Sequence, residues 1–124
     1  MPPLPLTLLD SVTQATPALA GHVVVTGSHG GASVVRYARA VRALLYVFND
    51  AGIGKDGAGI AALAELERHG IAACAVSHDS ARIGEAQDAW AHGVISAVNS
   101  QASGLGLASG QRLRDAVGPL LAKD

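Results

Sequence analysis

The chain is short of cysteine, aromatic and charged residues, and each shortage narrows the class of protein. Cys74 is the only cysteine, so no disulfide can form within the chain. Aromatic residues make up 3% of the sequence, which predicts a core of aliphatic and alanine side chains. Charged residues account for 15%, whereas a typical domain has about 25%, so we expect self-association to cover part of the surface of a homo-oligomer.

Several sequence signals of function are also missing. With a net charge of -1 and no basic stripe, the chain is not expected to bind nucleic acid. No apolar run approaches the roughly 18 residues of a membrane span, and the first residues lack the positive charge of a signal peptide. No glycine motif typical of a dinucleotide site or a P-loop occurs, so no cofactor is expected. These absences favour a cytoplasmic protein that does not bind membranes.

Short apolar runs alternate with amphipathic segments of helical spacing, which is typical of parallel β-α-β units. Right-handed crossovers place helices on the faces of such a sheet. We therefore predict a small three-layer α/β domain, Rossmann-like or flavodoxin-like, with about four parallel strands. The strands are expected over residues 22–26, 43–48, 71–76 and 94–98, with helices over about 32–42, 57–69, 81–92 and 111–121.

A length of 124 residues fits one domain. We expect residues 22–124 to form a single α/β domain. The proline-punctuated residues 1–21 are expected to precede it as an arm or a short helix, and the pattern does not decide between the two.

Polar and glycine-rich clusters follow the first three expected strands, at residues 26–31, 49–56 and 77–82. The carboxyl ends of parallel strands lie along one edge of the sheet, where open α/β folds bind ligands. His29 and His78 are the acid/base candidates, because imidazole exchanges a proton near neutral pH. Asp50 is predicted to orient a histidine or to remove a proton. These three residues form the predicted catalytic group.

The same clusters contain groups suited to holding an anion. Glycine amides at the start of a helix, together with lysine and arginine side chains, bind phosphate or carboxylate groups. The predicted ligand-binding residues are Gly27, Ser28, Gly30, Gly31, Asn49, Lys55, Ser77, Ser80 and Arg82. The remaining histidines, His22, His69 and His92, are expected to be structural, and Cys74 to be a buried inert thiol.

These residues favour an enzyme that acts on a small anionic molecule by acid/base chemistry, of hydrolase or lyase type. A non-catalytic module that binds a small ligand or nucleotide, an assembly subunit, and a structural interaction protein remain as alternatives. His29, Asp50, His78 and Asp79 have side chains that suit a divalent metal, but no local ligand spacing supports one. A triad with Ser28 or Ser77 as nucleophile ranks below proton transfer, because no G-x-S-x-G motif is present.

Overall fold

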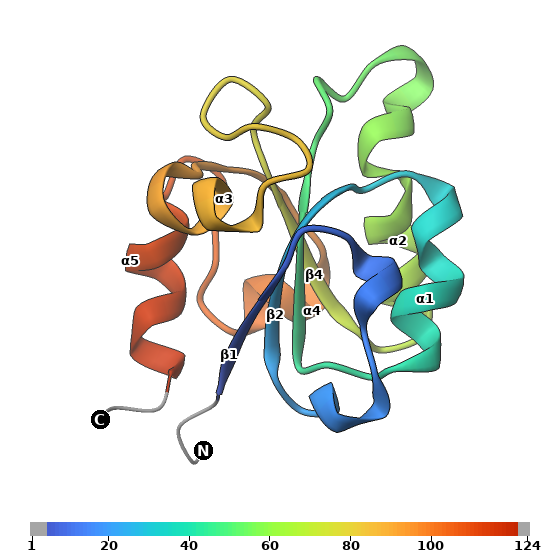
Figure 1. The fold of residues 1–124 in the computed structure, drawn as a ribbon. Helices are drawn as coiled ribbons and strands as arrows, with labels where there is room; N and C mark the ends of the chain where they lie inside the picture. Colours follow the sequence, from blue (N-terminus) through green and yellow to red (C-terminus); the bar gives the residue numbers. More distant parts are fainter. Residues whose placement is uncertain (1–4, 122–124) are drawn as a thin grey trace.

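The computed structural model describes residues 5–121, which form a five-stranded sheet with helices on both faces (Figure 1). The strands lie across the sheet in chain order, and the first four are parallel. They are β1 (Leu6–Leu9), β2 (Val23–His29), β3 (Leu45–Asn49), β4 (Ala72–Val76) and β5 (Ile95–Val98). The predicted α/β fold class, a small three-layer domain, is confirmed.

Two helices, α1 (Val35–Ala40) and α2 (Ala61–Arg68), cover one face of the sheet, and α3 (Ala86–His92) and α5 (Leu113–Val117) cover the other (Figure 1). The short α4 (Ser100–Gly104) follows β5. Five 3-10 turns complete the regular structure: η1 (Val12–Gln14), η2 (Pro17–Leu19), η3 (Ala32–Val34), η4 (Lys55–Ile60) and η5 (Gly118–Leu120).

Strands β2, β3 and β4 are buried on both faces over most of their length, so the sheet separates two cores. Successive side chains of a strand point to opposite faces. On β3, Tyr46 and Phe48 pack with α1 and α2, whereas Leu45 and Val47 pack with α3 and α5. Alanine dominates β4, where small side chains allow close packing of helix on sheet. Alanine and aliphatic side chains thus fill the core, which contains few aromatic residues.

The prediction that residues 94–98 form a parallel strand is wrong, because β5 runs antiparallel to β4. The route of the connection explains the reversal. The chain leaves β4 at the carboxyl edge of the parallel strands, and the Ser77 amide still donates a hydrogen bond of 2.9 Å to the carbonyl of Val94. The intervening segment therefore never returns to the opposite edge, as a parallel strand would require.

Residues 6–9, for which the sequence favoured an arm or a short helix, form the edge strand β1. The Val23 amide donates to the Pro5 carbonyl at 2.9 Å, so the pairing begins directly after a proline. Proline is tolerated at such a position because it needs no ladder donor there. Only η1 and η2 are helical between β1 and β2.

Within residues 5–121, no helix is long and apolar enough to cross a membrane.

Candidate functional site

Hydrogen bonds connect the loops that follow β1, β2, β3 and β4 at the carboxyl ends of these parallel strands. Residues 81–85, here called the strap, lie across the end of β2. The Gly84 amide donates to the Gly27 carbonyl at 2.6 Å, and the Ala86 amide, next to the strap, donates to Asp10 Oδ1 at 3.0 Å. A Cβ at Gly27 would overlap the backbone of Gly84 and Glu85. The strap therefore covers Gly27.

Asp50, directly after β3, is a buried carboxylate that accepts three hydrogen bonds. Its Oδ1 accepts from the Gly52 amide at 2.8 Å and from the His78 amide at 3.0 Å, and its Oδ2 accepts from Ser96 Oγ at 2.7 Å. Its side chain is only 5% exposed. These bonds join the ends of β3 and β4 to the antiparallel β5.

The Asp50 carboxyl is held in its ionised form. Burial alone raises its pKa, but hydrogen bonds from Ser96, Gly52 and His78, together with the adjacent His78 imidazole, lower it by more. The net pKa therefore lies below that of an ordinary aspartate, and Asp50 is charged at neutral pH.

The His78 imidazole lies between two carboxylates. Its Nδ1 is 3.5 Å from Asp50 Oδ1, and its Nε2 is 3.2 Å from Asp79 Oδ1. The His78 side chain is 52% exposed and that of Asp79 is 87% exposed, so only Asp50 is a fixed partner. The ring is therefore held from its buried side, while Nε2 faces only the exposed Asp79 carboxylate, which a ligand can displace.

His29 lies in a neighbouring hollow of about 410 Å³. Its Nδ1 accepts a hydrogen bond of 3.0 Å from the Gly31 amide, so in the neutral ring the proton is on Nε2. His29 is then a hydrogen-bond donor to a ligand. The hollow is otherwise lined by small or apolar residues: Gly31, Ala32, Ala51, Ile53, Gly54, Ala58 and Gly59.

The loop after β3 separates His29 from His78 and holds a strained backbone. Its Ala51 and Ile53 line the hollow of His29, while a Cβ at Gly52 would lie 3.4 Å from the His78 ring. Ala51 and Ile53 have φ values of 50° and 64°, which are unfavourable for residues with a side chain, above all for a β-branched one. Such strain concentrates at functional sites.

The predicted cations stand apart from the Asp50–His78 pair. Lys55 is exposed and follows Gly54, which lines the hollow. Arg82 belongs to the strap, where its guanidinium is 4.0 Å from Glu85 and is largely exposed. The structure therefore brings Asp50 and His78 into contact, places His29 beside them, and leaves Lys55 and Arg82 at the periphery.

The other predicted ligand-binding groups already have partners within the chain. The Gly30 amide donates to the Asn49 carbonyl at 3.0 Å. Ser28 Oγ accepts from the Val12 amide at 2.9 Å, and Asn49 Nδ2 donates to the Ala81 carbonyl at 2.9 Å. Ser77 and Ser80 bond to each other through their hydroxyl groups at 2.9 Å. These groups position the loops, and a ligand role for them stays a prediction.

The sequence interpretation missed Ser96. It lies in β5, one residue along the strand from the buried Ile95, and donates to Asp50. A serine within an otherwise apolar run was a usable signal, but its contact depends on the reversed direction of β5.

Between residues 5 and 121, no group of three or more histidine, cysteine, aspartate or glutamate side chains is arranged to hold a metal ion. Comparisons with known proteins found no matching family model, no significantly similar curated protein and no significantly similar solved structure.

Proposed function

We propose that the protein is an enzyme that acts on a small anionic molecule by acid/base chemistry, of hydrolase or lyase type. The observation that carries this proposal is the contact of His78 with the buried, ionised Asp50. A carboxylate behind one imidazole nitrogen holds the ring and stabilises the imidazolium, so the other nitrogen can take up and return a proton.

His78 Nε2 would remove a proton from water in a hydrolysis, or from carbon in an elimination, and return it to the leaving group. In the structure this nitrogen faces the carboxylate of the exposed Asp79. Because the Asp79 side chain is 87% exposed, a bound substrate would displace it and bring its reacting proton to Nε2. The neighbouring His29 would donate from Nε2 to an oxygen of the substrate.

A substrate screen tests this proposal. Wild-type protein is incubated in D₂O buffer with pools of small carboxylates and phosphate esters, and ¹H NMR follows product signals and exchange of substrate C–H for deuterium. We expect turnover or exchange of at least one compound, and its loss in His78→Ala. Compounds that bind beside His29, with neither turnover nor exchange, would instead support a non-catalytic binding module, which the open hollow also suits.

The low charge content also favours a homo-oligomer. We expect light scattering to give a mass above that of one chain at micromolar concentrations, since many small domains gain stability by association. A monomer mass throughout that range would contradict this expectation.

A further inference from the structure

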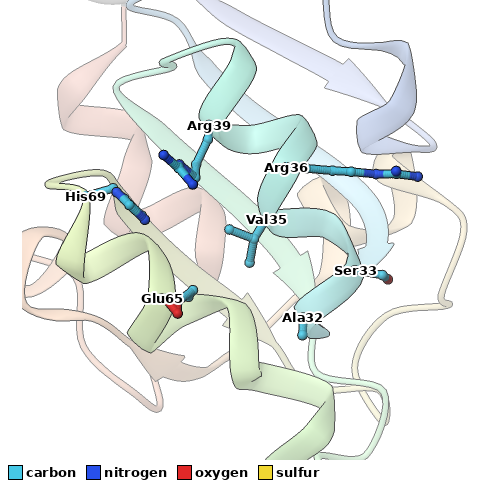
Figure 2. Close-up of a pocket in the computed structure, with 7 residues that line it drawn as sticks. All are labelled: Ala32, Ser33, Val35, Arg36, Arg39, Glu65 and His69. Carbon is cyan, nitrogen blue, oxygen red and sulfur yellow. The ribbon is translucent and has the colours of Figure 1, made fainter.

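A second hollow, wider than that of His29, lies between α1 and α2. This arginine cleft has a volume of about 670 Å³, and its walls include Val35 and Arg39 from α1 and Glu65 and His69 from the end of α2 and its cap (Figure 2). Figure 2 shows the Arg39 side chain directed towards His69, whereas Arg36 extends the opposite way. Neither His69 nor Arg39 belongs to the acid/base site described above.

The side chains that line the cleft carry two positive charges and one negative charge. Arg36 and Arg39 line it, Arg42 Nη2 donates to the His69 carbonyl at 2.8 Å, and Arg68 contacts Glu65 at 3.5 Å. Of these four arginines only Arg36 and Arg39 line the cleft, together with the single carboxylate of Glu65. Because Arg36 extends away from His69, Arg39 is the cation that the cleft offers to a ligand (Figure 2).

The one carboxylate of the cleft does not neutralise Arg39. Glu65 is paired with Arg68 on its own helix. Among the described residues, Arg39 takes part in no ion pair and no side-chain hydrogen bond, although its guanidinium shares the cleft with a half-buried histidine. A guanidinium offers a planar pair of donors that matches a phosphate group.

The arginine cleft adjoins the hollow of His29, because Ala32 lines both. Seven residues separate Ala32 from Arg39 along η3 and α1, which corresponds to about 10 Å of helix. A ligand that extends over this length from Ala32, at the edge of the hollow of His29, would reach Arg39 along one side of α1.

We propose that the arginine cleft binds the phosphate group of a phosphorylated small molecule whose other end lies in the hollow of His29. Arg39 is the main phosphate ligand, and His69 adds a second donor. This inference rests on the proposed function, since it names the class of anionic substrate that the enzyme takes.

Inorganic pyrophosphate is the probe for this site. In ¹H–¹⁵N NMR titrations at low ionic strength we expect shifts in residues 32–39 and 65–69 and in the Arg39 Nε–H. Arg39→Gln should weaken binding about tenfold, which is the loss of one charge-assisted contact at an exposed site. Arg39→Lys should recover part of this loss, because it retains the charge but not the paired donors.

Arg112→Gln is the matched control, because it removes the same charge from an exposed position at the start of α5, on the other face of the sheet. It should bind pyrophosphate as the wild type does. Equal weakening by Arg39→Gln and Arg112→Gln, or shifts confined to other regions, would overturn the proposal. So would the absence of shifts up to about 10 mM probe.

His78→Ala separates this proposal from the catalytic one. It should retain pyrophosphate binding, because His78 does not line the cleft. Pyrophosphate binding at the cleft without any turnover in the substrate screen would support the phosphate site and refute the proposed enzymatic activity. Turnover without pyrophosphate binding at the cleft would support the enzymatic activity and refute the phosphate site.

Discussion

Turnover by His78→Ala should be about 10²- to 10⁴-fold lower than that of the wild type, which is the usual contribution of one general acid or base. The reason is that the exposed His78 imidazole can reach a ligand through Nε2, while its Nδ1 lies 3.5 Å from the ionised Asp50. The measurement is kcat/KM on the compound that the substrate screen identifies. Because the His78 side chain is 52% exposed, its removal should leave the fold intact.

His92→Ala is the matched control for that measurement. His92 is also exposed, but it lies in the last turn of α3 and contributes to neither hollow. It should keep wild-type activity. If His78→Ala and His92→Ala were equally active, His78 would not be the proton-transfer group.

Replacing Asp50 with alanine should lower the free energy of unfolding by about 2–4 kcal/mol at pH 7. The change leaves the amides of Gly52 and His78 and the hydroxyl of Ser96 without their acceptor. An unpaired donor costs about 1–3 kcal/mol when buried, and these three are partly buried. Asp50→Asn retains an acceptor oxygen and should lose only about 1 kcal/mol. Urea unfolding monitored by circular dichroism gives both values.

The same carboxylate makes stability depend on pH. The pKa of Asp50 is lower in the folded chain than the ordinary value of about 3.9 expected when it is unfolded. Its stabilising contribution is therefore complete at neutral pH and is lost as pH falls below about 5 towards the folded pKa. The difference in unfolding free energy between the wild type and Asp50→Asn should shrink from pH 7 to pH 3.

Asp56→Asn controls for the loss of a carboxylate in the same loop. Asp56 is exposed, and its φ of 57° suits asparagine as well as aspartate. This variant should match the stability of the wild type at each pH. A constant gap between the wild type and Asp50→Asn across that range would contradict the ionised, hydrogen-bonded state of Asp50.

The sequence predicted three of the five strands well, because β2, β3 and β4 are continuous apolar runs that end in glycine and polar residues. It did not predict β1, whose four residues Leu6–Leu9 follow prolines and show no distinctive period. The sequence also did not predict the direction of β5, because this direction depends on the route of the chain after β4 rather than on the composition of the strand.

Only part of the candidate site could be predicted from the sequence, for the same reason. Asp50 and His78 follow neighbouring parallel strands, so sequence reasoning could place them together. The contact between Ser96 and Asp50 spans 46 residues and exists only because β5 is reversed. The placement of His69 opposite Arg39 (Figure 2) depends on how α1 and α2 pack, which the sequence did not predict.

Chemical rescue of His78→Ala by imidazole shows whether His78 transfers a proton during the reaction. The histidine is accessible to solvent, so free imidazole can occupy the space left beside Asp50 and accept the proton in its place. We expect added imidazole to raise kcat/KM of His78→Ala several-fold and saturably, and to leave that of the wild type unchanged. A folded His78→Ala protein with wild-type activity, or one whose lost activity imidazole never restores, would contradict it.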